Sequence, residues 1–306
     1  MKHAIAICAY LLATTTPLPA SDEEPEAPSI KYSAPEQLKG ASEADFTFQK
    51  YAPGDLLYIA PHDVNLRAAA DPKAAVVATL PMATQVKVLE VASNRTTVIG
   101  KVDRWYQVEV LDAGPAKGKT GFLFGMLLTP AAFRADLDGD GELEVVTAAF
   151  AQNFKIRVRV RELGSAEPSH VKIDVDSAGG AYLGQRGGRA TIKLVPKETA
   201  GLGLVEVFAH VEACADYATH WVSYTVPGAK PKLLGSAKLA MTQSGLADSP
   251  VHSSYEVTFD ARRRTAKAVQ TQTMDDEEGE SVTKTTTQYA LKNGVYVEQP
   301  QDKKQP

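Results

Sequence analysis

The stretch "TQVKVLEVA" at residues 84–92 alternates apolar and polar side chains with a period of two. A single polar residue separates Val86 from Val88, and the same pattern recurs further along at Val108 and Val110. Side chains of a β-strand point to opposite faces in turn, so this period is typical of strands with one buried face. The pattern predicts β-structure, not helix, in this part of the chain.

Further short β-type runs lie on both sides of this stretch and fill residues 54–130. Turn residues of the Pro, Asp, Gly and Asn types separate them, as expected for strands joined by tight turns. These runs read "LLYIA", "AVVATL", "WYQVEVL" and "TGFLFG". We therefore predict that residues 54–130 form one small β-domain, a barrel or a sandwich.

Several short motifs in this segment follow one another in a characteristic order. They are Asn65-Leu66-Arg67; the apolar positions Val76, Val77 and Leu80; Trp105, Tyr106 and Val108; and Gly118, Gly121 and Phe122. With these motifs the segment resembles a bacterial SH3-like (SH3b) domain. It departs from the usual pattern where Phe122 replaces a Trp and where residues 92–104 form a long insertion.

The resemblance implies a binding module whose ligand is peptidoglycan or a peptide. It also implies that the ligand would be held beside the motif residues, in the region that the insertion adjoins. The candidate ligand-binding residues are Asn65, Arg67, Trp105, Tyr106 and Phe122.

Residues 131–299 continue the strand pattern with almost no helical periodicity. Runs such as "FKIRVRVREL" and "HVKIDVD" alternate, and Asn293-Gly294 between two alternating runs is a strong signal for a type I′ hairpin. We found no repeat of the length that marks a propeller or solenoid. The fold class is therefore predicted as all-β, with a small SH3-like barrel followed by a larger antiparallel β-domain, either a sandwich or a meander.

The larger domain opens with the acidic segment "DLDGDGELE" at residues 136–144. Calcium takes about six to eight oxygen ligands, and alternate carboxylates on a tightly turning loop supply them. A glycine at the sixth place, Gly141, allows the sharp turn. The candidate ligands are Asp136, Asp138, Asp140, Glu142 through its backbone carbonyl, and Glu144.

The loop is not a helix-loop-helix hand, because Thr147 stands at the twelfth place and β-branched residues follow. It resembles the loops of the FG-GAP or VCBS type, which precede a strand in extracellular β-domains. We predict a structural Ca²⁺ ion with a dissociation constant of about 10⁻⁴ to 10⁻³ M, as in other extracellular modules. The alternative is a solvated acidic turn without a metal.

The N-terminal residues have the three parts of a secretory signal. A basic start is followed by an apolar run and by Leu18-Pro19-Ala20, which predicts a signal peptide over residues 1–20 and an exported protein, periplasmic or extracellular. Residues 21–53 are rich in Pro, Glu, Ser and Ala and are predicted to be a flexible linker. Residues 300–306 are predicted to be a disordered tail.

The composition of the chain bears on nucleic-acid binding, membrane insertion and disulfide formation. The 306 residues carry a net charge of -4, which gives no reason to expect nucleic acid. The apolar run at residues 4–13 is shorter than the roughly 20 apolar residues that a transmembrane helix needs, and no other segment reaches that length. Of the two cysteines, Cys8 lies within the signal, so Cys214 has no partner for an intramolecular disulfide.

Two other groups of residues admit a functional and a structural interpretation. One strand face carries four cationic residues, Lys155, Arg157, Arg159 and Arg161. This face is either the solvent-exposed side of an edge strand or a patch that binds an acidic polymer. His210, Cys214 and His220 suggest zinc or a thiol enzyme, but a lone cysteine in a strand is the commoner outcome. No Gly-x-Ser-x-Gly, His-Glu-x-x-His or phosphate-loop motif occurs.

The sequence therefore predicts an exported, non-enzymatic binding protein. Its SH3-like module docks to cell wall or peptide, and calcium stabilises its second domain. One alternative is a component of an envelope assembly in which both domains bind proteins. A third interpretation is an unrecognised hydrolase. The oligomeric state does not follow from the sequence.

Overall fold

The computed structural model confirms the all-β prediction. Strands in four antiparallel sheets make up most of the described chain, and no helix within it has the length and apolar character needed to cross a membrane. The signal segment and Cys214 lie outside the described residues. The described residues are 27–32, 49–98, 101–151, 155–163, 170–177, 188–210, 216–225, 235–246, 251–276 and 279–300.

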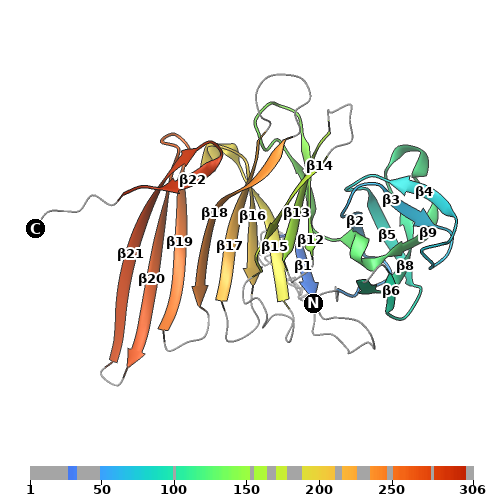
Figure 1. Ribbon diagram of the computed structural model, residues 1–306, viewed down its shortest axis with the longest axis horizontal. Coiled ribbons are helices and arrows are strands. Elements are labelled where there is room, and N and C mark those ends of the chain that lie inside the picture. The colour runs from blue at the N-terminus through green and yellow to red at the C-terminus, as the bar shows by residue number, and fades with distance from the viewer. Residues whose placement is uncertain are drawn as a thin grey trace, which may run out of the picture.

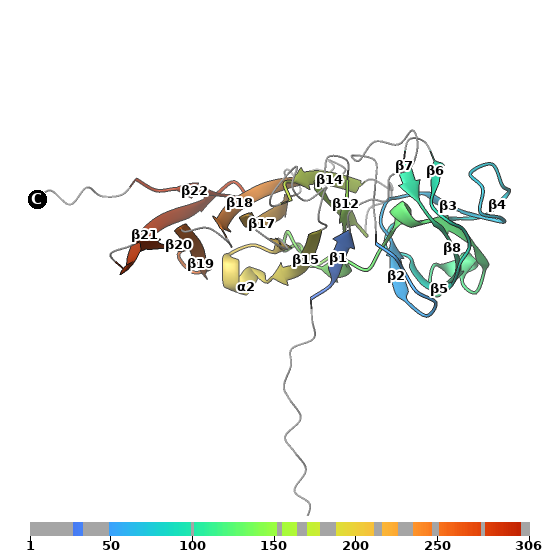
Figure 2. The same ribbon diagram turned by 90° about the horizontal axis from the view of Figure 1, so that it is seen from below.

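The small domain is a seven-stranded sheet that curls around its own core (Figures 1 and 2). Val86, Val88, Val108 and Val110 are all fully buried there, so the period-two prediction is confirmed. In spatial order the strands are β10 (Leu128–Thr129), β2 (Leu56–Ile59), β5 (Gln85–Val91), β8 (Trp105–Val110), β9 (Thr120–Phe124), β3 (Val64–Arg67) and β4 (Val76–Leu80).

The long insertion of the small domain forms its own hairpin. β6 (Thr96–Val98) and β7 (Lys101–Asp103) pair as a separate two-stranded sheet. Short 3-10 turns, η2 (Gly114–Ala116) and η3 (Gly125–Leu127), flank β9. The insertion therefore extends the domain without interrupting the seven-stranded sheet.

The large domain contains two sheets that face each other. The smaller one has the order β11 (Ala132–Ala135), β12 (Glu144–Phe150), β13 (Ile156–Glu162) and β14 (His170–Val175). The larger one has the order β1 (Ser29–Tyr32), β15 (Gly188–Val195), β16 (Leu204–His210), β17 (Asp216–Thr225), β18 (Ser236–Leu246), β19 (Val251–Asp260), β20 (Thr265–Asp276), β21 (Gly279–Lys292) and β22 (Val295–Glu298), with α2 (Lys197–Ala200) between β15 and β16.

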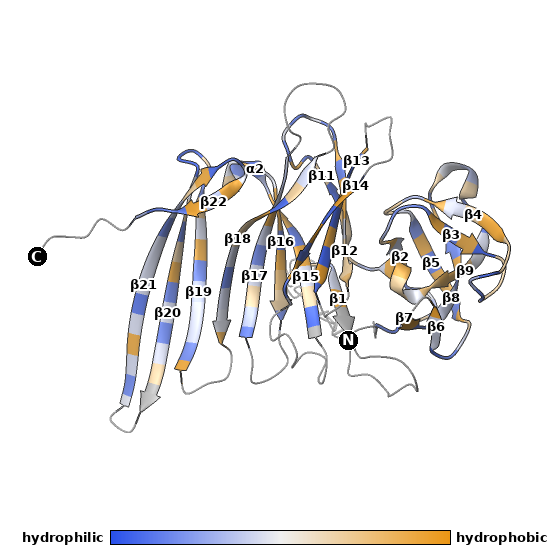
Figure 3. Cartoon of the chain, in the orientation of Figure 1, coloured by the Kyte–Doolittle hydropathy of each residue, from blue (hydrophilic) through white to orange (hydrophobic). Residues whose placement is uncertain are grey.

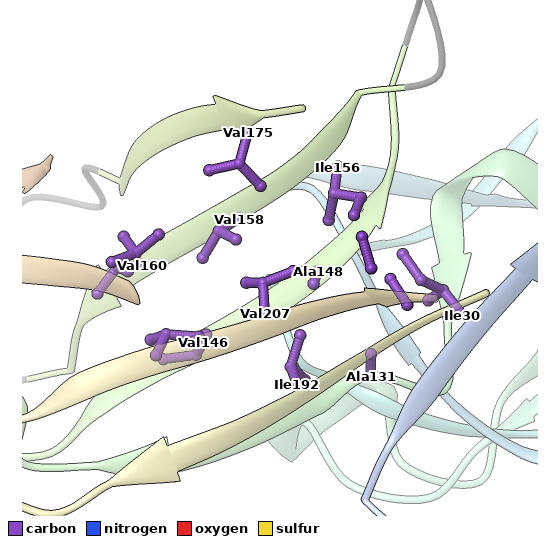
Figure 4. Packing of buried hydrophobic residues seen from close by; sticks show 14 of the residues in the cluster. Ile30, Ala131, Val146, Ala148, Ile156, Val158, Val160, Val175, Ile192 and Val207 are labelled. Atoms are coloured by element: carbon purple, nitrogen blue, oxygen red, sulfur yellow. The ribbon is translucent and has the colours of Figure 1, made fainter. Parts of the chain in front are cut away.

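The main core lies between these two sheets (Figure 4). Val146 and Val158 from the four-stranded sheet face Ile192 and Val207 from the nine-stranded sheet, and all four are fully buried. Both predicted arrangements of this domain are present, because β15 to β22 form a meander and its first half packs as a sandwich. The sandwich stacks β-branched side chains, which suit a pleated surface.

The second half of the meander extends past the four-stranded sheet (Figure 1). Its core is a smaller cluster that includes Trp221, Met241, Leu291 and Tyr296. Along β19, β20 and β21 hydrophilic and hydrophobic residues alternate (Figure 3). The turn between β21 and β22 contains Asn293 at φ 52° and Gly294 at φ 80°, which confirms the left-handed pair expected there.

The prediction of a flexible linker over residues 21–53 is wrong at residues 29–32. These residues form β1, which pairs antiparallel with β15 at the edge of the nine-stranded sheet. Ile30 is 2% exposed and belongs to the main core. Local composition does not reveal this strand, because its partner lies about 160 residues away in the sequence.

Ile30→Ala is expected to lower the free energy of unfolding by about 2–5 kcal/mol, the usual cost of removing a buried Ile side chain. Urea unfolding measures the change. Ser29→Ala in the same strand is the control and should stay within about 0.5 kcal/mol. An Ile30→Ala protein as stable as the wild type would show that β1 does not contribute to the core.

The two domains meet at β12. The hydroxyl of Thr147 donates to the carbonyl of Ala60 at 2.8 Å, and Val145 packs against Met82 and Ala83. Through these contacts the small domain packs against the face of the four-stranded sheet that points away from the main core.

The cationic residues of β13 share one face, as predicted, but β13 is not an edge strand. It lies between β12 and β14, and the neighbouring strand supplies acidic partners. Arg157 makes two hydrogen bonds of 2.7 Å to Asp174, and Lys155 lies 2.8 Å from Asp176. The face is therefore partly neutralised by ion pairs across the strands.

Candidate metal centre and ligand surfaces

The acidic loop between β11 and β12 is folded around the carboxylate of Asp136. Its Oδ1 accepts the N–H of Gly139 at 2.6 Å and its Oδ2 accepts the N–H of Gly141 at 3.1 Å. The two glycines have φ of 83° and 93°, which L side chains rarely adopt. The glycines at the fourth and sixth places therefore let one aspartate close the turn.

The other two aspartates stabilise the loop in the same way. The carboxylate of Asp138 accepts the N–H of Asp140 at 3.2 Å, and that of Asp140 accepts the N–H of Glu142 at 2.8 Å. The side chain of Glu142 is exposed and belongs to neither carboxylate cluster described below. Its predicted contribution through the backbone carbonyl stays a prediction.

Two groups of carboxylates converge at this loop. Asp136, Asp138 and Glu144 form one, with ligand oxygens within 4.8 Å of one another, and Asp138, Asp140 and Glu162 form the other. Asp138 is shared, so the two groups make one acidic centre. Of the predicted ligands, the structure brings together Asp136, Asp138, Asp140 and Glu144.

Glu162 is the acidic residue that the sequence interpretation missed. It ends β13, and its Cα lies opposite that of Glu144 in the β12–β13 ladder. Directly opposed residues of an antiparallel pair have neighbouring side chains. The only local signal is that this carboxylate ends a run of alternating arginines, which by itself points to no site.

Glu144 is buried without full hydrogen bonding. Its side chain is 0% exposed, and Oε2 accepts the N–H of Leu137 at 2.5 Å. Oε1 and both carboxylate oxygens of Glu162 are buried and accept no hydrogen bond from an N–H or hydroxyl donor among the described residues, and the two side chains lie against each other. Two buried carboxylates in contact are costly to ionise unless they share a proton or a cation.

The pKa values of three carboxyl groups at the acidic centre are raised. Burial raises the pKa of Glu144 to about 8, and the neighbouring carboxylate of Glu162 adds to this shift. Burial also raises the pKa values of Glu162 and Asp138. Hard carboxylate oxygens in this number are the donor set that calcium prefers, so the residues present fit the ion.

The predicted ligand-binding residues of the small domain divide into two groups, and Trp105 and Tyr106 belong to its interior. Trp105 is 4% exposed and packs on Phe124, whereas Tyr106 is fully buried against Tyr51 with ring centroids 5.3 Å apart. Their placement corrects the expectation that both rings face a ligand, because the curled sheet closes over them.

Asn65, Arg67 and Phe122 lie at the surface or close to it. Arg67 on β3 is directly opposite Phe122 on β9. Asn65 is exposed, while Arg67 and Phe122 are partly exposed. Arg67 also donates to the carbonyl of Ala74 at 2.8 Å, which fixes the loop between β3 and β4. These three residues are the part of the predicted set that can meet a ligand.

The histidines do not form a metal site within the described residues. His220 is 4% exposed, and its two ring nitrogens contact the carbonyl of Asp176 at 2.6 Å and the hydroxyl of Thr242 at 2.9 Å. His210 packs on Phe208 instead, with ring centroids 4.0 Å apart. Among those residues only the two acidic groups have the spacing of a metal site.

Comparison with known proteins supports the first resemblance. Residues 62–129 match the family model of the bacterial SH3 domain. No curated protein and no solved structure matches the chain. The match covers the strands from β3 to β10 and leaves the large domain without a named relative.

Proposed function

We propose that the bacterial SH3 domain at residues 62–129 makes this chain an exported, non-enzymatic binding protein that docks to peptidoglycan or to a peptide of the cell envelope. The family match is the observation that carries the proposal, since such domains are binding modules often associated with the cell wall. The signal-like residues 1–20 support export to the periplasm or the cell exterior.

The large domain is proposed to hold a structural calcium ion. Asp136, Asp138, Asp140 and Glu144 would supply carboxylates in the manner of an FG-GAP or VCBS loop, and Glu162 would add one from the next strand. A bound divalent cation offsets the repulsion among buried carboxylates and ties the loop to β13. The buried, contacting carboxyl groups of Glu144 and Glu162 support this assignment.

Docking to the wall is tested by co-sedimentation. The mature protein is mixed with purified peptidoglycan sacculi, and the fraction bound is measured over a range of sacculus concentrations. Phe122→Ala is expected to weaken binding roughly tenfold, because a partly exposed aromatic ring at a binding surface contributes a large share of its affinity. Leu56→Ala is the control, since Leu56 is 52% exposed on β2 of the same domain.

Mature protein that stays in the supernatant at every sacculus concentration would contradict docking to the wall. That outcome would favour the second candidate, a component of an envelope assembly. A specific observation supports this candidate, because β22 pairs only with residues 289–292 of β21. Within the described residues the outer edge of residues 279–285 pairs with no strand, and an open edge can accept a strand from a partner.

A further inference from the structure

A polar pocket lies next to the acidic centre. Its volume is about 590 Å³, and it is formed at one end of the sandwich by turns from different parts of the chain. The acidic loop supplies one side, and the residues around α2 and the turns at the ends of β17, β19 and β21 supply the others. The SH3 domain contributes no residue to it, so this surface is separate from the proposed wall-docking face.

The pocket shares two residues with the proposed calcium site. Asp138 and Asp140 line the pocket and also belong to the carboxylate clusters. An ion held by these two side chains would therefore lie at the wall of the pocket. Calcium takes more oxygens than a few carboxylates provide, and the remaining places are open to water or to a ligand oxygen.

Two basic side chains line the same pocket. Lys197 follows β15, and Arg264 lies in the turn between β19 and β20. Neither forms an ion pair within the described part of the chain. Lys197 reaches the acidic loop, since a Cβ added to Gly139 would lie only 2.1 Å from its Nζ. The pocket thus places free cationic groups beside the proposed ion.

We propose that this pocket binds a small molecule through a carboxylate group, which would contact the calcium ion and the side chains of Lys197 and Arg264 together. The proposal rests on the calcium site proposed above. A carboxylate supplies hard oxygens to calcium and matches the planar fork of a guanidinium. Tyr224 and Thr225 line the same space.

The charge around the pocket favours a singly charged anion. The two basic side chains and the proposed ion supply the positive charge that attracts an anion, while the carboxylates of the acidic centre limit how much negative charge the pocket accepts. A doubly charged phosphate would meet more repulsion here than a carboxylate does. The carboxylate can belong to an acidic sugar or to the C-terminus of a peptide, and both present the same chemistry.

Isothermal titration calorimetry on the full mature chain tests the proposal, with calcium binding measured first in the same sample. Calcium-loaded protein is then titrated with two matched pairs, glucuronic acid against glucose and acetyl-Ala-Ala against its amide. At least one acid is expected to bind while its neutral partner does not, and the pair that responds identifies the source of the carboxylate. Chelation of calcium should abolish this binding.

Variants locate the site. Arg264→Gln and Lys197→Gln should each weaken binding of the acid roughly tenfold, the usual effect of losing one hydrogen bond to a charged group. Arg262→Gln, an exposed arginine in the same turn but outside the pocket, should leave it unchanged. All three should retain calcium binding.

Two results would overturn the inference while the calcium proposal stands: calcium heat without binding of either acid, or binding of an acid that survives chelation. Absence of calcium heat would instead refute the metal site and, with it, this inference.

Discussion

Glu144→Gln is expected to abolish the stabilisation of the large domain by calcium without destabilising the calcium-free protein. The wild-type side chain is fully buried, accepts a hydrogen bond from Leu137 and opposes Glu162 in the β12–β13 ladder. An amide of nearly the same shape keeps the acceptor oxygen. Because burial raises the pKa of Glu144 to about 8, the amide replaces a mostly protonated carboxyl group in the calcium-free protein at neutral pH, whereas in the presence of calcium it removes a carboxylate ligand.

The size of the effect follows from mass action. With a dissociation constant of about 10⁻⁴ to 10⁻³ M, 10 mM calcium stabilises the wild type by about 1.4–2.7 kcal/mol. For a domain of this size that is a rise in Tm of roughly 3–10 °C. Differential scanning calorimetry with and without calcium measures it, and Glu144→Gln should show no such rise.

Glu142→Gln is the matched control for this prediction. Glu142 lies in the same loop, its side chain is exposed and outside both carboxylate clusters, and its backbone carbonyl is unchanged by the substitution. It should keep the calcium-dependent rise in Tm. An equal rise in Glu144→Gln and wild type would show that Glu144 holds no ion.

Tyr106→Ala is expected to have the largest effect on the small domain, a loss of about 3–5 kcal/mol in its free energy of unfolding. The ring is fully buried on the central strand β8 and contacts Tyr51, whose N–H donates to the Tyr106 hydroxyl at 3.4 Å. Its removal leaves a cavity that the packed sheet fills only in part. Urea unfolding followed by fluorescence and circular dichroism measures the loss.

Tyr106→Phe separates packing from hydrogen bonding. It keeps the ring and should cost about 1 kcal/mol, the usual value for one hydrogen bond. Phe122→Ala at the partly exposed position of β9 should cost less than Tyr106→Ala while affecting ligand binding. If Tyr106→Ala left stability unchanged and removed only ligand binding, the ring would belong to the ligand surface after all.

Local patterning is sufficient for much of this architecture. The period-two runs at Val86 and Val108 identify strands, because a half-buried strand needs alternate side chains of opposite character. Asn293-Gly294 identifies a hairpin, because both residues accept positive φ. The spacing of Asp136, Asp138 and Asp140 similarly identifies the acidic turn, since its hydrogen bonds join residues only two to five positions apart.

Other features depend on contacts between distant residues. Composition places Ile30 in a linker, yet pairing with β15 and burial in the sandwich order it. The motif residues Trp105 and Tyr106 cannot be assigned to core or surface until the sheet curls and covers them. A strand pattern predicts which side chains share a face, but it does not predict what covers that face.

The acidic centre depends both on local sequence and on contacts between distant residues. The turn around the three aspartates follows from local sequence, because a short loop closed by its own backbone N–H groups needs no distant partner. The folded chain is needed to show that Glu144 is fully buried, that Glu162 lies opposite it, and that Lys197 and Arg264 line the adjoining pocket. Those positions follow from strand register and sheet packing, which join residues far apart in the chain.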